Sequence, residues 1–369
     1  MNEKAVLVGL KLPQDNFNDI QESMLELKRL ADTAGAEVVD ILIQAKSTID
    51  GRFYIGKGKI EEIREFYADE KVDLVVFNHE LSPAQVRNIE KELECRVLTR
   101  TELILDVFAI HARTRAAKMQ VELAQLKYQL PRLVGHYQNL SRTDGGIGLR
   151  GPGEQKLEVD RRILRKKIHF IETKLIEIER EKDTQRKKRM GEFKVSIIGY
   201  TNSGKSTLLN KISKSDVLAE DKLFSTLDTT TRRVWLGDGS IALISDTVGF
   251  IRDIPVGLIE SFKSTLADAR YADMLLHVAD VSDPALADHL RSVNQTLKEI
   301  GADNKPALLC LNKIDLLPRE ILLDIRLRYP GAIFISAKEG QYTDDLKNKV
   351  KDMMKGIAVI KEQGEPEHE

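Results

Sequence analysis

Gly199-Tyr200-Thr201-Asn202-Ser203-Gly204-Lys205-Ser206 is the stretch that decides the fold of this chain. It matches the phosphate-binding loop pattern G-x-x-x-x-G-K-[ST], the P-loop. The apolar residues 193–198 before it predict a buried strand, and residues 207–211 after it predict the start of a helix. Together these elements surround a phosphate with unpaired backbone N–H groups and the positive end of a helix dipole. A chance glycine turn is the alternative, and the flanking elements argue against it.

Two side chains of the loop suit a nucleotide and its metal ion. Lys205 would contact the β- and γ-phosphates, and the Ser206 hydroxyl would bind Mg²⁺. We therefore expect residues 199–206, together with Thr207 at the start of the helix, to bind a nucleoside triphosphate. The loop alone does not say which base the nucleotide carries.

Composition narrows the class of protein. The 369 residues suffice for two or three domains, and 42% hydrophobic with 31% charged residues is typical of a globular protein. Only 5% of the residues are aromatic, so stacking platforms for bases are not expected. Cys95 and Cys310 indicate neither a disulfide framework nor a metal site, and Cys310 should be buried. Without an apolar span or a signal-peptide layout, we expect a cytoplasmic location.

Charge is unevenly distributed along the chain. Residues 111–190 contain 20 Lys and Arg against 10 Asp and Glu, a net charge of +10. Because the whole chain carries −1, the remainder carries −11. A basic segment on an acidic body indicates a localised contact with nucleic acid.

Residues 1–110 alternate strand and helix signals, which predicts an α/β subdomain with a mainly parallel sheet. The expected strands are 5–10, 38–43, 72–77 and 97–98, and the expected helices are 18–34, 60–67 and 83–93. Gly35 should end the first helix, while Ser82 and Pro83 should begin the third. Gly56-Lys57-Gly58-Lys59 is interpreted as a turn with solvated lysines in preference to a phosphate contact, and His79 as structural.

Residues 111–190 predict a helical hairpin. Apolar positions recur at spacings of three and four between Thr114 and Tyr128, and again between Leu157 and Ile178, so two antiparallel helices should pack along narrow seams. Pro131 should disrupt the first helix near its end. Arg186-Lys187-Lys188-Arg189 closes the second helix, either as a junction or as a nucleic-acid contact.

A glycine-rich segment, residues 141–154, joins the two helices. Its G-x-G-x-x-G spacing does not indicate a dinucleotide site, because a helix and not a strand precedes it. A glycine loop with two arginines at the tip of a basic hairpin suits contact with RNA, and a flexible connector is the alternative. The expected RNA contacts are Arg142, Gly145, Gly146, Gly148, Arg150, Gly151 and Gly153.

Residues 191–358 predict a doubly wound α/β sheet, which would bind its ligand at the carboxyl ends of the strands. The expected strands are 194–198, 233–236, 241–245, 274–279, 307–311 and 333–335. Residues 359–369 should be an acidic, disordered tail.

Three segments at predicted strand ends identify the nucleotide. In Asp246-Thr247-Val248-Gly249, the aspartate would hold Mg²⁺ through water, and the Gly249 N–H would bond the γ-phosphate. In Asn312-Lys313-Ile314-Asp315, the Asp315 carboxylate can accept two hydrogen bonds from guanine, whereas adenine lacks that pair of donors. Ser336-Ala337-Lys338 would place backbone N–H groups near guanine O6. The sequence therefore predicts a GTP site.

The segment Phe224-Ser225-Thr226-Leu227-Asp228-Thr229-Thr230-Thr231 lies where a mobile switch supplies a threonine to Mg²⁺, and spacing alone does not select one of its four threonines. Phe250 occupies the position of the water-orienting glutamine of Ras-like enzymes. We infer slow intrinsic hydrolysis that a partner stimulates by ordering the switches. A hydrolysis-dead binding module is the competing interpretation.

These residues together resemble the HflX family of ribosome-associated GTPases, over nearly the whole chain. Besides the loop and strand-end segments, the resemblance is carried by residues 54–59, 81–85, 100–106, 125–133, 145–154 and 224–228. It implies that Thr226 is the switch ligand of Mg²⁺, beside Ser206 and Asp246. Lys205, Thr226 and Gly249 are then the expected catalytic residues.

The resemblance also implies a partner and a role. It implies a GTPase that binds the large ribosomal subunit, with the glycine loop reaching towards the peptidyl transferase centre, and that splits or rescues stalled ribosomes under stress. A monomer is assumed. A non-catalytic, nucleotide-gated assembly or storage-state binder is the alternative, and an RNA-dependent ATPase ranks third. Many family members carry a small domain after the GTPase domain, whereas about one helix and the acidic tail are expected here beyond Ser336-Ala337-Lys338.

Overall fold

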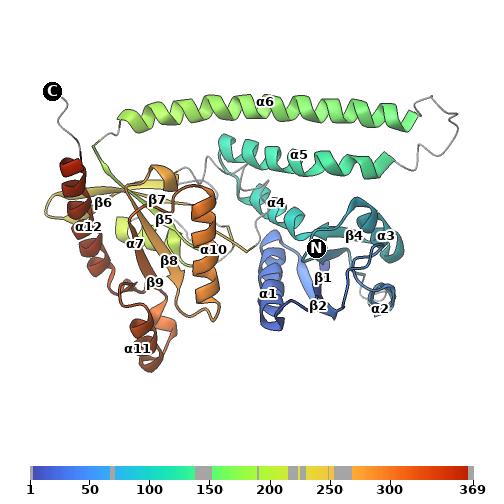
Figure 1. Ribbon diagram of the computed structural model, residues 1–369, viewed down its shortest axis with the longest axis horizontal. Coiled ribbons are helices and arrows are strands. Elements are labelled where there is room, and N and C mark those ends of the chain that lie inside the picture. The colour runs from blue at the N-terminus through green and yellow to red at the C-terminus, as the bar shows by residue number, and fades with distance from the viewer. Residues whose placement is uncertain are drawn as a thin grey trace. The chain divides into compact units, whose positions relative to one another are not determined.

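The structure is a computed structural model that describes residues 3–66, 71–137, 152–188, 191–214, 223–224, 230–247, 249–252 and 268–364 (Figure 1). The chain divides into two compact units. The N-terminal unit comprises Met1–Ile178 with Pro255–Ser261, and the C-terminal unit comprises Glu179–Ile254 with Phe262–Glu369. Among the described residues, no helix combines the length and the apolar character that crossing a bilayer requires.

A four-stranded parallel sheet forms the centre of the N-terminal unit. Its strands are β1 (Lys4–Lys11), β2 (Glu37–Ala45), β3 (Leu74–Phe77) and β4 (Arg96–Thr99), in the order β2-β1-β3-β4. The helices are α1 (Phe17–Ala34), α2 (Lys57–Phe66), α3 (Pro83–Leu93) and α4 (Arg100–His111). The inner residues of β1 and all of β3 are buried, as expected for strands that helices cover on both faces. The predicted parallel α/β arrangement is confirmed.

Helix boundaries follow the predicted capping residues. Gly35 adopts the left-handed conformation that ends α1, with φ of 88°. Ser82 begins α3 with a capping box that it forms with Gln85, and Pro83 occupies the first helical position. The interpretation of Gly56-Lys57-Gly58-Lys59 as a turn was wrong, because Lys57, Gly58 and Lys59 form the first turn of α2. Gly56 is held to β2, since its N–H donates to Gln44 Oε1 at 2.7 Å.

A buried ion pair connects the helices of the N-terminal unit to its sheet. Arg100, 4% exposed at the start of α4, lies with Nη2 2.5 Å from Glu26 Oε2 on α1. Its Nη1 also donates to Asn78 Oδ1 at 2.9 Å, directly after β3. Asn78 in turn donates to Ser23 Oγ at 2.9 Å. These bonds fix the helices relative to the carboxyl end of the sheet.

Two long helices, α5 (Arg115–Tyr137) and α6 (Pro152–Lys188), follow this sheet and lie side by side, running antiparallel (Figure 1). On α6 the apolar seam uses the predicted positions Leu164, Ile168, Ile171 and Leu175. On α5 the prediction was wrong, because the seam is formed by Met119, Leu123 and Leu126 and not by the predicted positions Thr114, Ala117, Val121, Ala124 and Tyr128. The prediction that Pro131 disrupts the first helix was wrong, because α5 continues to Tyr137. Pro131 lacks only the N–H that would donate to the Lys127 carbonyl, and the helix continues for six residues beyond it.

The C-terminal unit contains a six-stranded sheet in the order β10-β9-β8-β5-β7-β6. Its strands are β5 (Phe193–Ile198), β6 (Thr230–Gly237), β7 (Ser240–Asp246), β8 (Met274–Asp280), β9 (Ala307–Asn312) and β10 (Ile333–Phe334). All neighbouring strands are parallel except β6 and β7. The helices are α7 (Lys205–Ser213), α10 (Leu286–Glu299), α11 (Arg319–Arg328) and α12 (Thr343–Gly364), with a 3-10 turn at Ile314–Leu316. The predicted doubly wound sheet is confirmed.

The end of the chain differs from its prediction. Residues 359–364 were expected to belong to a disordered tail, but α12 continues to Gly364. Composition alone missed this because the acidic and glycine residues obscured an amphipathic pattern that begins at Thr343. The apolar side of α12 packs on the sheet through Leu346 and Val350.

We predict that Glu26→Ala lowers the free energy of unfolding of the N-terminal sheet by about 3–5 kcal/mol, because the substitution leaves the Arg100 charge buried and uncompensated. Amide hydrogen exchange of β1 and β3, followed by mass spectrometry, measures the change. Glu61→Ala is the matched control, since it removes an exposed partner of Lys57 and should cost less than about 1 kcal/mol. Equal exchange rates in the two variants would contradict the role assigned to the buried pair.

Candidate functional site

The P-loop connects β5 to α7 and has room only for glycine at two positions. Gly199 has φ of 149°, and a Cβ atom there would lie 2.0 Å from the Val278 carbonyl oxygen. Gly204 has φ of 90°, and its Cβ would lie 2.2 Å from Asn312 Nδ2. The loop is therefore pressed against the ends of β8 and β9, with no space for a side chain on that side.

The loop also contains hydroxyl groups suited to a ligand. Thr201 Oγ1 and Ser203 Oγ are buried and have no hydrogen-bond partner within the described part of the chain. Such groups are rare in folded proteins and call for an unseen partner. They lie immediately before the N-terminus of α7, where backbone N–H groups are also unsatisfied. This chemistry fits a bound phosphate chain.

Lys205 is buried at the start of α7, with 6% of its surface exposed. Its Nζ donates to the Tyr200 carbonyl at 2.7 Å. Burial lowers the pKa of Lys205 to about 8, against the opposing effect of the Asp246 carboxylate. A polyanion beside this ammonium group would favour its charged form, so the position fits the predicted contact with phosphates.

Ser206 and Asp246 are brought together from α7 and the end of β7. Ser206 Oγ donates to Asp246 Oδ2 at 2.6 Å, and Asp246 is buried. A hydroxyl and a carboxylate oxygen are hard donors of the kind that Mg²⁺ prefers. The pair therefore fits the predicted metal site.

The segment after Asp246 lies against the P-loop. Thr247 donates its hydroxyl to the Ile197 carbonyl at 2.7 Å, so this side chain has a structural use, and Val248 lies outside the described residues. A Cβ at Gly249 would lie 2.7 Å from Thr201 Cγ2, which makes glycine necessary here. The Phe250 carbonyl accepts from the Thr201 N–H at 2.7 Å. The backbone of the Gly249 segment is thus paired directly to the phosphate-binding loop.

Phe250 is 1% exposed, and its own N–H donates to the Gly199 carbonyl at 3.1 Å. A buried phenyl ring offers no group that could orient an attacking water. The geometry agrees with the expectation that this chain lacks the usual glutamine function.

Segments that follow β9 and β10 form the opposite end of the site. Asn312 donates from Nδ2 to the Ser203 carbonyl and accepts at Oδ1 from the Ala337 N–H, both at 2.9 Å. It therefore joins the P-loop to the segment Ser336–Lys338, in which Ser336 and Ala337 are buried and Lys338 is exposed. Asp315 lies in the 3-10 turn after β9 and is exposed, where its carboxylate is accessible to a base.

Lys313 has a partner that the sequence analysis missed. Its Nζ lies 2.7 Å from Asp280 Oδ2, at the end of β8. The position of Asp280 directly after a predicted strand was the available signal. The sequence analysis also did not single out His277 on β8. Burial, together with the nearby Lys205, lowers the pKa of its imidazole to about 4, so the ring is neutral at pH 7.

The switch segment is described only at its ends. Phe224 is buried with φ of 57°, whereas residues 225–229, including Ser225, Thr226, Leu227 and Asp228, lie outside the described residues. Thr230 and Thr231 belong to β6, and Thr231 Oγ1 lies 2.9 Å from Ser245 Oγ. Of the four candidate threonines, these two are therefore strand residues.

Most of the predicted RNA contacts are also outside the described residues, namely Arg142, Gly145, Gly146, Gly148, Arg150 and Gly151. Gly153 lies in the first turn of α6 and not in a loop. Pro152 at the first helical position explains why the helix begins earlier than expected.

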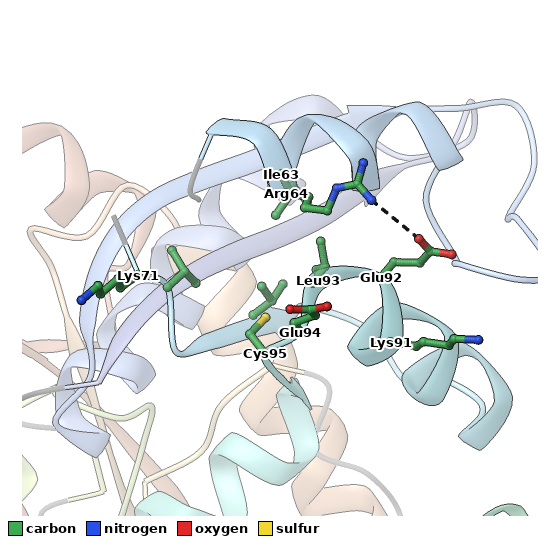
Figure 2. A pocket seen from close by; sticks show the side chains of 10 residues that line it. Ile63, Arg64, Lys71, Lys91, Glu92, Leu93, Glu94 and Cys95 are labelled. Atoms are coloured by element: carbon green, nitrogen blue, oxygen red, sulfur yellow. Dashed lines mark ion pairs between the residues drawn. The ribbon is translucent and has the colours of Figure 1, made fainter. Parts of the chain in front are cut away.

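A cavity of about 440 Å³ in the N-terminal unit does not compete with this site (Figure 2). It lies beside α2 and α3, at the amino ends of β3 and β4, whereas ligands of parallel sheets bind at the carboxyl ends. Its carboxylate Glu92 lies 4.0 Å from Arg64. Burial raises the pKa of the Cys95 thiol to about 11, so this group is not a nucleophile at neutral pH.

Comparisons with known proteins match successive parts of the chain. The family described as "GTP-binding GTPase N-terminal" matches residues 21–109, and "GTP-binding GTPase Middle Region" matches residues 111–189. The family described as "50S ribosome-binding GTPase" matches residues 194–313. The solved structure of the SsGBP and GDP complex aligns with a TM-score of 0.54 at 27% identity, over 95% of this chain and 98% of that one.

Two relatives that match over most of their length carry the same name. GTPase HflX of Caldanaerobacter subterraneus subsp. tengcongensis is 47% identical over 362 residues, 97% of this chain and 82% of that protein. GTPase HflX of Escherichia coli K12 is 42% identical over 360 residues, 96% of this chain and 83% of that protein. With this similarity and a P-loop fold, the chain belongs to the HflX family of GTPases and is a GTP hydrolase.

Proposed function

We propose that this GTPase binds the large ribosomal subunit and splits or rescues stalled ribosomes in the cytoplasm, as part of a response to stress. The observation that carries the proposal is the basic helical pair α5 and α6, within a segment of net charge +10, joined to a GTPase unit. The match to a family described as "50S ribosome-binding GTPase" supports the same partner. GTP would favour the ribosome-bound conformation, and hydrolysis would release it.

The nucleotide would occupy the edge of the sheet where the P-loop and the strand-end segments meet. Ser206, Asp246 and Thr226 would hold Mg²⁺, with Asp246 acting through water. When bound, Mg²⁺ would neutralise charge on the β- and γ-phosphates. Lys205 and the Gly249 N–H would contact the γ-phosphate, and Asp315 would read guanine while residues 336–338 approach its O6.

The buried Phe250 supports slow hydrolysis by the chain alone. Because this ring cannot orient water, the attacking nucleophile must be positioned by a group that becomes available when a partner orders the switches. The ribosome is the partner that the basic hairpin favours. Arg142 and Arg150 would contribute contacts with phosphates of ribosomal RNA.

We expect purified ribosomes to accelerate single-turnover GTP hydrolysis by roughly 10²-fold or more, a modest value for partner-stimulated GTPases. The measurement compares phosphate release with 70S ribosomes, with isolated small subunits and without either. Sucrose-gradient sedimentation with a non-hydrolysable GTP analogue should then show conversion of intact ribosomes to subunits.

Two results would contradict the proposal in different ways. An unchanged hydrolysis rate would refute stimulation by the ribosome. Sedimentation with intact ribosomes, without conversion to subunits, would instead support a non-catalytic binder that nucleotide merely gates.

We expect Asp315→Asn to shift the preference of the chain from guanosine towards xanthosine nucleotides, because the amide then offers a donor where guanine presents donors and xanthine presents an acceptor. Competition titrations with GDP and xanthosine diphosphate measure the change. Asp324→Asn, at an exposed carboxylate on α11, is the matched control and should bind like the unmodified chain. An unaltered base preference in Asp315→Asn would refute the assignment of guanine to this residue.

A further inference from the structure

The second residue of the P-loop, Tyr200, makes contacts that a phosphate-binding loop does not itself require. Its ring lies flat against the ring of His289 on α10, with centroids 3.7 Å apart and planes inclined by 13°. Tyr200 is 7% exposed and His289 is half-buried, so the stack is largely shielded from solvent. Because Tyr200 and Lys205 belong to one loop, and Lys205 Nζ donates to the Tyr200 carbonyl at 2.7 Å, α10 is connected to the phosphate end of the site.

The hydroxyl of Tyr200 has a second partner on the other side of the site. It accepts a hydrogen bond from the Arg252 N–H at 2.8 Å, three residues after Gly249. The Arg252 guanidinium lies 3.5 Å from Asp288 Oδ2, and Asp288 directly precedes His289 on α10. The contacts therefore close a ring from the P-loop to the segment Gly249–Arg252, on to α10, and back to Tyr200.

This ring supplements the backbone pairing at Phe250. The two hydrogen bonds between Phe250 and the P-loop, at 2.7 and 3.1 Å, hold only the inner part of the segment. The Tyr200 hydroxyl holds its outer part, at Arg252. Together they hold the backbone that follows Gly249 against the P-loop.

We propose that Tyr200 is a positioning residue for GTP hydrolysis, which fixes the Gly249–Arg252 segment against the P-loop through its hydroxyl and is itself held by the stack on His289. The inference rests on the proposed placement of the γ-phosphate at Gly249. A donor fixed before the reaction stabilises developing charge without reorganisation. Tyr200 should therefore affect the step at the γ-phosphate and not the binding of GDP, which lacks that group.

The test separates these two effects in the full chain. Tyr200→Phe keeps the ring and removes only the hydroxyl, and we expect kcat for GTP to fall by about two- to tenfold, the range of one net hydrogen bond. KM and the Kd for GDP should stay within about twofold. His289→Ala should lower kcat in the same way by removing the stack, whereas His289→Phe, which keeps a flat ring, should restore it.

Two controls make the outcome decisive. Tyr342→Phe, at a tyrosine that is 52% exposed, should behave like the unmodified chain. Lys205→Ala should abolish tight nucleotide binding, and retained binding would show that the proposed nucleotide site itself is wrong. If Lys205→Ala loses binding while Tyr200→Phe keeps full kcat, or loses GDP affinity in proportion to kcat, only the inference about Tyr200 is overturned.

Discussion

The Asn312 side chain makes the two hydrogen bonds on which the geometry of the site depends. Its amide donates to the Ser203 carbonyl and accepts from the Ala337 N–H, both at 2.9 Å, and the residue is 2% exposed. Three loops that follow β5, β9 and β10 are thereby fixed to one another. The close approach of Gly204 to this amide, where a Cβ would lie 2.2 Å from Nδ2, is a direct consequence. The proposed contacts with phosphate and with the base would thus share one support.

Much of this support could be predicted from the sequence, because parallel strands bring their carboxyl ends to one edge of a sheet. Ser206 and Asp246 are 40 residues apart, yet the P-loop pattern and a strand end were enough to place them in one site, and the structure brings their oxygens to 2.6 Å. The capping of α3 by Ser82 and the α6 side of the seam around Ile171 were predictable for a similar reason. Each depends on local spacing, which the sequence displays directly.

The features that could not be predicted depend on particular side-chain partners. Pro131 remains inside α5, whose residues Leu123 and Leu126 pack against Ile171 of α6. The ion pair between Asp280 and Lys313 could not be predicted, because the two residues follow different strands and meet only in the folded sheet. The stack of Tyr200 on His289 joins residues whose sequence separation gave no pattern to recognise. Propensity and periodicity do not encode such contacts, since these arise only once the sheet has assembled.

The central claim is that Asn312 holds the phosphate and base ends of a GTP site in a fixed relation, and the GDP affinity of Asn312→Ala tests it most directly. The variant leaves the Ser203 carbonyl and the Ala337 N–H buried without partners. We predict a rise in Kd of roughly tenfold or more, the cost of one or two such groups. Asn312→Asp keeps the acceptor for the Ala337 N–H but sets a carboxylate oxygen against the Ser203 carbonyl oxygen, so its Kd for GDP should rise at least as much as that of Asn312→Ala. An affinity of Asn312→Ala equal to that of the unmodified chain would contradict the account.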